Sequence, residues 1–401
     1  MHWTFVAPNI MRISAIGAAA AVGFSTALTS IFSAILVITC LFSWRLIDLL
    51  RQSFSNPISK MVLIFFTVLV FGCFVGSVSL EKCLDSLWSW RKVFFIVILI
   101  PIFYDELWKK KFLAIFLATS LLGLLISSLS WLGLIEYQID NAPGVVLQNW
   151  ATQGMIFAVS ILILYYQAEE FQNWSRKVSY GLAFIFLLNI IFITPGRSGY
   201  IALGAVLITI GVSKYGLKRL PLIGICLVAF GFTAYLLSPS MQEKVNAGFR
   251  VFQEYKVATK PPLNSETFRL MAYENTLELI KERSLIGHGT GSFENVFGNH
   301  VKYKYSDWRN RKISDPHNQY LFIVFENGLI GLLIFVCFLL SPFFLKLQKK
   351  DSFYYIGIGV LLTWLTTSFF SSHFRTFSEG HLVAFFIGVM FSSQNRLITR
   401  R

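Results

Sequence analysis

Charged residues are scarce in this sequence. Only 14% of its 401 residues are Asp, Glu, Lys or Arg, whereas 55% are hydrophobic and 40 are phenylalanine. A soluble domain of this length carries nearly twice that share of charge, and it does not contain repeated apolar runs of membrane-spanning length. The composition therefore excludes a soluble globular protein and indicates an integral membrane protein.

Cysteines and metal-binding patterns are also sparse. Four of the five cysteines fall in apolar runs, which leaves Cys83 alone in a loop, so we predict no disulfide framework. The sequence has no His-Glu-x-x-His, no paired Asp-x-Asp in a loop and no Cys/His cluster with ligand spacing, and we expect no metal and no other cofactor. His288 and His300 lie near glycines and are expected to be surface histidines.

Apolar runs divide the chain into about twelve predicted membrane-spanning helices. We expect an all-α polytopic membrane protein with spans 1–9 in residues 1–237, a large helical loop at 238–318, and spans 10–12 with a terminal tail at 319–401. The run at 92–104 is short and contains Pro101. The predicted spans lie near residues 11–26, 28–43, 61–79, 92–104, 112–134, 149–166, 179–194, 199–214, 219–237, 319–345, 353–371 and 380–394.

The basic residues predict the orientation of these spans. The net charge is +14, but the positive residues lie in short clusters between apolar runs, so we expect membrane lipids and no nucleic acid as partners. Loops after even-numbered spans carry most of the Lys and Arg, as in Lys109-Lys110-Lys111, and the short odd-numbered loops carry few. The positive-inside rule therefore places both termini in the cytoplasm and the loop 238–318 on the other side, which in a bacterium is the periplasm.

The long loop 238–318 is predicted to be structured. Residues 240–256 suit an amphipathic helix on the membrane surface. After a break at two consecutive prolines, a second helix is expected near 266–283. A glycine-rich turn and the basic stretch 302–312 then lead to the tenth span.

Three polar residues are expected together on the outer face. Arg197 lies in the short turn before the eighth span, Arg269 in the second loop helix, and His317 directly before a helix. Taken singly, each has a structural explanation, respectively an interface anchor, a solvated charge and a neighbour of a helix cap. Together they suit attack on a lipid-diphosphate-linked sugar. Arginine forks bind phosphate oxygens, and a histidine accepts the proton of an acceptor hydroxyl.

Three further residues are predicted to support this group. Glu326 lies about two turns into the tenth apolar segment and is either a buried carboxylate with a partner or an interface residue just before a span that starts near Gly328. We favour the second alternative, with Glu326 orienting an arginine. Asp315 is expected to orient His317, and Asn318 to cap the helix that follows.

These residues and the late outer loop resemble the O-antigen ligase family. The patterns that carry the resemblance are Pro195-Gly196-Arg197-Ser198-Gly199, the block from Phe268-Arg269 to Phe293, and His317-Asn318-Gln319-Tyr320-Leu321 with Glu326-Asn327-Gly328-Leu329-Ile330-Gly331. The resemblance implies an inverting, metal-independent glycosyltransferase of the bacterial inner membrane. It would move an O-antigen glycan from undecaprenyl diphosphate to the lipid A core oligosaccharide on the periplasmic face. By the same resemblance, His317 is catalytic, and Arg197 and Arg269 bind the diphosphate.

Several alternatives stay open. O-antigen polymerases and protein O-oligosaccharyltransferases share the donor and differ in the acceptor. A secondary transporter would show paired halves and broken polar helices near the midplane, which the sequence does not indicate. A structural scaffold would leave the three-residue group unexplained. Five basic residues suit either docking of lipid A core phosphates or a solvated surface: Lys302, Lys304, Arg309, Arg311 and Lys312.

Overall fold

The protein is described by a computed structural model that covers residues 2–76, 78–139, 141–194, 196–257, 265–345 and 350–392. Within these ranges the regular secondary structure is helical, which confirms the predicted all-α class. The helices are α1 (His2–Ala21), α2 (Thr26–Leu41), α3 (Leu46–Ser55), α4 (Pro57–Val75), α5 (Leu80–Trp90), α6 (Phe94–Leu99), α7 (Glu106–Trp131), α8 (Trp150–Glu170), α9 (Asn173–Leu188), α10 (Arg197–Tyr215), α11 (Leu220–Leu237), α12 (Pro239–Val257), α13 (Ser265–Glu282), α14 (Phe293–Lys304), α15 (Gln319–Leu340), α16 (Ser352–Thr367) and α17 (Phe377–Met390).

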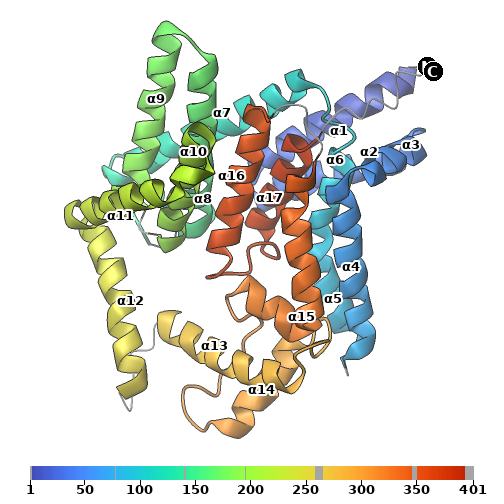
Figure 1. The fold of residues 1–401 in the computed structure, drawn as a ribbon, viewed down its shortest axis with the longest axis vertical. Helices are drawn as coiled ribbons and strands as arrows, with labels where there is room; N and C mark the ends of the chain where they lie inside the picture. Colours follow the sequence, from blue (N-terminus) through green and yellow to red (C-terminus); the bar gives the residue numbers. More distant parts are fainter. Residues whose placement is uncertain are drawn as a thin grey trace.

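The helices fall into a large apolar group and a smaller group at one end. Figure 1 shows α13 and α14 at the lower end of the molecule, beneath α15, while α12 descends from α11 along one side. The two loop helices expected at 240–256 and 266–283 are present as α12 and α13. The proline break expected between them, and the terminal tail from 393 onwards, lie outside the described residues.

Fewer helices are long enough to span a membrane than we predicted. In the described part of the chain, seven helices meet the length and hydropathy required, or eight if the bent pair α2–α3 counts as one span. This multi-pass pattern agrees with a membrane protein, but the prediction of about twelve spans is too high. The seven are Pro57–Val75, Glu106–Trp131, Trp150–Glu170, Asn173–Ile193, Arg197–Tyr215, Leu217–Leu237 and Gln319–Phe344.

Three short helices account for most of the difference. The run at 92–104 contains α6, whose six residues rise only about 9 Å. It continues a helical segment that begins with α5 and passes through a 3₁₀ turn at Arg91–Val93. The last two predicted spans correspond to α16 and α17, which are apolar but have 16 and 14 residues.

Close packing around α8 fixes the position of α10. Of an 18-residue apolar stretch of α8, 83% is buried inside the protein. Gly154 of α8 faces Gly199 of α10, and a Cβ added at Gly154 would lie 2.6 Å from the Cα of Gly199. Small residues let two helix backbones approach this closely. The contact lies two residues after Arg197, so it holds the start of α10, and with it that arginine, against the core.

A disulfide joins the end of α4 to the start of α5. Cys73 and Cys83 are bonded, with their Cα atoms 5.7 Å apart. The prediction of no disulfide was wrong, because α5 folds back on α4 and brings Cys83, near the start of α5, beside Cys73, near the end of α4. Disulfides form in oxidising compartments.

The disulfide predicts a simple alkylation pattern. In protein denatured without reductant, iodoacetamide is expected to modify Cys40, Cys226 and Cys337, which are free thiols. Cys73 and Cys83 should react only after reduction. Mass spectrometry of the peptides distinguishes the two groups, and alkylation of all five without reductant would contradict the bond.

Candidate functional site

Helices α13 and α14 and the start of α15 form a small packed unit. Buried apolar residues of α13, α14 and α15 make one cluster, and they are Met271, Leu279, Phe293, Phe297, Val301, Phe322 and Phe325. Burial of such side chains contributes roughly 1.5 to 3 kcal/mol each. This cluster fixes α13 against α15 and so sets the distance between Arg269 and His317, which those two segments carry.

Arg197 connects the apolar helices to this unit. It is the first residue of α10, and its Nη1 lies 2.8 Å from Oε1 of Glu266 in the first turn of α13. Its Nη2 donates a hydrogen bond of 3.0 Å to the main-chain oxygen of Lys244 in α12. The guanidinium therefore contacts two loop helices, which goes beyond the role of an interface anchor.

Glu266 contacts one of the two predicted phosphate-binding arginines and shares a helix with the other. Arg269 follows Glu266 by three residues in α13, so the two side chains share one face of the helix. Burial raises the pKa of the Glu266 carboxyl, but the Ser265 hydroxyl and the charges of Arg197 and Arg269 outweigh it and the pKa is lowered. Glu266 therefore carries a negative charge next to both arginines. We did not predict it, although the i, i+3 spacing to Arg269 was a usable signal.

The backbone of His317 is held in an uncommon conformation. Its φ is +56°, in the left-handed region that few non-glycine residues adopt. Asp315 Oδ1 accepts a hydrogen bond of 2.6 Å from the His317 main-chain N–H, and the Tyr273 hydroxyl donates one of 3.1 Å to its main-chain oxygen. Asp315 thus positions the backbone of His317, and Tyr273 of α13 is a contact that we did not predict.

Asn318 caps α15 as expected. Its Oδ1 accepts hydrogen bonds of 3.0 Å from the N–H groups of Tyr320 and Leu321, and its Nδ2 donates to the main-chain oxygen of Phe369. The cap starts α15 directly after His317. The imidazole therefore lies beside the positive end of a helix dipole, which favours its neutral form.

The electrostatic surroundings of His317 include Arg269. The side chain is exposed, yet the protein around it still desolvates the ring. Desolvation is the largest influence and lowers the pKa; Asp315 raises it, Arg269 lowers it further, and the net shift is downwards. A cation that repels the imidazolium lies near it. Arg197 pairs with Glu266, and the charge of Arg269 acts on both Glu266 and His317. We call these four residues the outer cluster.

Arg375 contacts Asp315, which accepts the hydrogen bond from the main-chain N–H of His317. It lies in the turn before α17, its Nη1 is 3.4 Å from Asp315 Oδ2, and its Nε donates a 3.1 Å hydrogen bond to Ser89 Oγ. Its guanidinium carbon lies 3.9 Å from the centroid of the Phe322 ring. Asp315 is therefore held between Arg375 and the backbone of His317. We predicted no role for Arg375, because only the approach of the α16–α17 turn to α15 reveals it.

Glu326 holds a turn. It is 1% exposed, its Oε1 accepts a hydrogen bond of 3.0 Å from Gly291 N–H, and Ser86 Oγ lies 3.5 Å from Oε2. Neither partner is an arginine, so these hydrogen bonds do not include the predicted contact of Glu326 with an arginine. Two residues later, Gly328 has a φ of +65° and interrupts α15. The predicted break in the tenth apolar segment is therefore present, but Glu326 is a buried carboxylate with hydrogen-bond partners, which is the alternative that we did not favour.

The glycine-rich turn at 287–291 is wedged between α4 and the break in α15. His288 donates a main-chain hydrogen bond to the oxygen of Phe325, and Thr290 donates one to Gly72. His288 is 8% exposed and its ring stacks on Phe325 at 4.7 Å, so the expectation of a surface histidine was wrong for this residue. Buried backbone contacts on both sides give the turn a structural role.

The break at Gly328 predicts a large loss of stability on substitution. Gly328→Ala places a Cβ against the main-chain oxygen of Leu285 and forces alanine into a conformation that is almost confined to glycine. We expect a loss of roughly 3 kcal/mol. Thermal unfolding in detergent measures it, with Gly204→Ala as the control, since a Cβ at Gly204 of α10 meets open space. Equal melting temperatures for the two variants would contradict the assignment.

The basic stretch 302–312 is largely neutralised by the protein itself. Four of the five predicted docking residues have intramolecular partners, and Lys302 is exposed. The pairs are Lys304 with Glu278, Arg309 with Asp307, Lys312 with Glu294, and Arg311 over the ring of Phe268. His300 is half-buried and pairs with Glu278 at 3.2 Å. This arrangement gives less support to phosphate docking than the sequence suggested.

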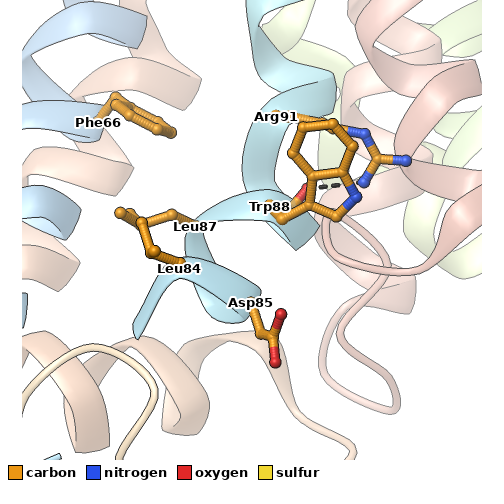
Figure 2. A pocket seen from close by; sticks show the side chains of 6 residues that line it. All are labelled: Phe66, Leu84, Asp85, Leu87, Trp88 and Arg91. Carbon is orange, nitrogen blue, oxygen red and sulfur yellow. Dashed lines mark hydrogen bonds between the residues drawn. The ribbon is translucent and has the colours of Figure 1, made fainter. Parts of the chain in front are cut away.

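A separate cavity opens between α4 and α5. Its volume is about 480 Å³, and it is lined by Phe66, Leu84, Asp85, Leu87, Trp88 and Arg91. Figure 2 shows Phe66 opposite the two leucines, with Arg91 folded over the Trp88 ring at 4.3 Å. No residue of the outer cluster lines this cavity. It is therefore a mainly apolar feature distinct from the arginine–histidine group.

The outer cluster has the parts of an anion site with an adjacent base. Two guanidinium groups offer paired donors to phosphate oxygens, and an accessible imidazole accepts a proton. Among the residues that the structure describes, no three His, Cys, Asp or Glu side chains come close enough to hold a metal ion.

Comparison with known proteins identifies the region that holds this cluster. Residues 182–336 match the family model described as O-antigen ligase, and they contain Arg197, Arg269 and His317. The chain is also 23% identical over 222 residues to an uncharacterized protein of Haemophilus influenzae, which covers 54% of each sequence. The chain thus spans about half the length of that curated relative. The match over residues 182–336 therefore supports a relationship between this region and the O-antigen ligase family.

Proposed function

We propose that the protein is a glycosyltransferase that moves a glycan from a lipid diphosphate to an acceptor at the outer surface of the inner membrane. The observation that carries this proposal is the outer cluster. His317 is exposed, the charge of Arg269 acts on both His317 and Glu266, and Glu266 pairs with Arg197. The cluster lies wholly within the region that matches the O-antigen ligase family.

In the proposed reaction, His317 acts as the general base. Its neutral imidazole takes the proton of an acceptor hydroxyl as the hydroxyl oxygen attacks the anomeric carbon of the donor sugar. The bond from that carbon to the diphosphate oxygen breaks on the opposite face, so the configuration inverts. Arg197 and Arg269 stabilise the negative charge that develops on the departing diphosphate.

The family resemblance supplies the proposed substrates. The donor is an undecaprenyl-diphosphate-linked O-antigen, and the acceptor is the lipid A core oligosaccharide. The loop at 238–318 and the active site would face the periplasm, with both termini in the cytoplasm. The basic loops and the Cys73–Cys83 disulfide support this orientation, since the bond lies near the same end of the molecule as the glycine-rich turn.

An O-antigen polymerase is a second candidate, and one observation favours keeping it. The basic stretch that suits docking of lipid A core phosphates is mostly paired within the protein. Donor chemistry at the outer cluster would be the same in either enzyme, and only the acceptor would differ.

Lipopolysaccharide profiling separates these functions. A strain lacking the gene would be complemented with wild type or with His317→Ala. For a ligase, we expect unmodified lipid A core and accumulation of full-length lipid-linked glycan unless wild type is present. A core that carries a single repeat unit would identify a polymerase. Restoration by His317→Ala equal to wild type would contradict the role of this residue.

The lowered pKa of His317 predicts the pH dependence of transfer. The base must be neutral, so activity should be present above the pKa of His317 and lost as the pH falls through it, below the usual value of about 6.5. Asp315→Asn removes an influence that raises this pKa, and should move the acidic limb of the pH–rate profile lower. Arg269→Lys keeps the charge and should leave the limb in place. A shift in the opposite direction for Asp315→Asn would contradict the assignment.

A further inference from the structure

We propose that Glu266 is an internal counter-anion that occupies the arginine pair until the diphosphate of the donor takes its place. This inference rests on the proposed function, because it assigns the same arginines to a diphosphate. It gives Glu266 the role of a positioning and selectivity residue, in addition to the residues named by the resemblance.

The ion pair has the geometry of an anion already bound. Glu266 Oε1 lies 2.8 Å from Arg197 Nη1, within the range of a charge-assisted hydrogen bond. The other terminal nitrogen, Nη2, is held by the main-chain oxygen of Lys244, so the guanidinium is pointed at Glu266 from a fixed position. Each terminal nitrogen of the guanidinium thus has a partner within the protein.

Glu266 is placed where an incoming anion would compete with it. The side chains of Arg197 and Glu266 are 31% and 22% exposed, so solvent and solutes reach the pair. The carboxylate lies in the first turn of α13, where the helix dipole favours a negative charge. Arg269 adds a second positive charge on the same side, which lowers the pKa of Glu266 further. The exposure of the pair, the helix dipole and the charge of Arg269 would each favour a phosphate oxygen in this position as much as a carboxylate.

The competition gives selectivity for a diphosphate. A carboxylate carries a single negative charge, whereas a diphosphate carries at least two and has enough oxygens to reach both arginines. A single phosphate gains little by displacing Glu266, because it replaces one arginine–anion contact with another. We therefore expect Glu266 to weaken the binding of all anions and to weaken that of monophosphates most.

Binding of inorganic pyrophosphate to the purified full-length protein tests this proposal. Glu266→Gln keeps the shape of the side chain and removes its charge, and it is expected to bind pyrophosphate about tenfold more tightly than wild type, with a larger gain for orthophosphate. The matched control is Glu278→Gln, the same change later in α13, where Glu278 pairs with Lys304 and His300. Its affinity should equal that of wild type.

Two further variants test whether the gain in pyrophosphate affinity comes directly from removing the charge of Glu266. Glu266→Asp keeps the charge and should bind pyrophosphate about as weakly as wild type. Adding Arg197→Ala to Glu266→Gln should abolish the gain, since the released guanidinium would be gone. Unchanged or weaker binding by Glu266→Gln, or a similar gain in Glu278→Gln, would overturn the proposal.

The outcomes also separate this proposal from the proposed function. If wild type and Glu266→Gln both fail to bind pyrophosphate while glycan transfer is intact, the counter-anion role is overturned and the transferase survives. If Glu266→Gln binds pyrophosphate more tightly in a protein that transfers no glycan, the counter-anion role stands and the transferase fails. In an active enzyme, Glu266→Gln should lower KM for the donor more than it changes kcat.

Discussion

Replacing His317 with alanine is expected to lower the rate of glycan transfer by roughly 10²- to 10⁴-fold, the usual contribution of a general base. The imidazole is exposed, and its pKa is lowered by desolvation and by Arg269 despite the opposing effect of Asp315, so it is neutral and ready to accept a proton near pH 7. Reconstituted protein with a lipid-linked donor and an acceptor measures the rate under single-turnover conditions.

The control for this variant is His300→Ala. His300 belongs to α14, in the packed unit formed by α13, α14 and the start of α15, and it pairs with Glu278, which is not part of the outer cluster. Its removal should leave transfer within about twofold of wild type, because its exposed ion pair contributes little. A loss in His300→Ala as large as that in His317→Ala would mean that transfer depends on the fold of the unit and not on a specific base.

Replacing Arg197 or Arg269 with alanine is expected to lower kcat/KM by roughly 10²- to 10³-fold each, as for the loss of one donor to a developing oxyanion. Both act on one diphosphate and both flank Glu266, so the double variant should lose less than the product of the single losses. Lysine should restore only part of the activity, because it lacks the planar fork of arginine.

Arg309→Ala is the matched control for the arginine variants. Arg309 lies in the segment after α14, and its guanidinium pairs with Asp307, two residues earlier. Its loss should leave kcat/KM within about twofold of wild type. Strict multiplication of the Arg197 and Arg269 losses would contradict their action on a shared group.

The main features of the site were predictable because they depend on local sequence. Asn318 caps a helix through the N–H groups that follow it, so His317 had to lie at a helix start. Arg197 follows a short turn between two apolar runs and therefore had to begin α10. The loop helix that carries Arg269 shows apolar spacing of its own.

The missed features all depend on contacts between distant segments. Glu266 pairs with Arg197, which belongs to a different helix. Arg375 contacts Asp315 only because the α16–α17 turn packs on α15. The Cys73–Cys83 bond likewise needs α5 to fold back on α4. Sequence spacing alone does not encode these approaches.

The number of spans was overestimated for a physical reason. Hydropathy measures how apolar a run is, but it does not show where a helix bends. The pair α2–α3 turns by 104° at a short break, and the apolar run at 92–104 contributes the six residues of α6 to a helical segment that starts in α5. Buried apolar residues can thus belong to helices too short to cross a bilayer.

The most direct test of the central claim is the stereochemistry of transfer by the purified protein in lipid vesicles. The donor would be an undecaprenyl-diphosphate-linked glycan of known anomeric configuration, the acceptor lipid A core oligosaccharide, and the readout the NMR coupling constant of the new linkage. A direct attack assisted by His317 predicts an inverted linkage and release of the lipid diphosphate, both lost in His317→Ala. A retained configuration, or equal transfer by His317→Ala, would contradict the account.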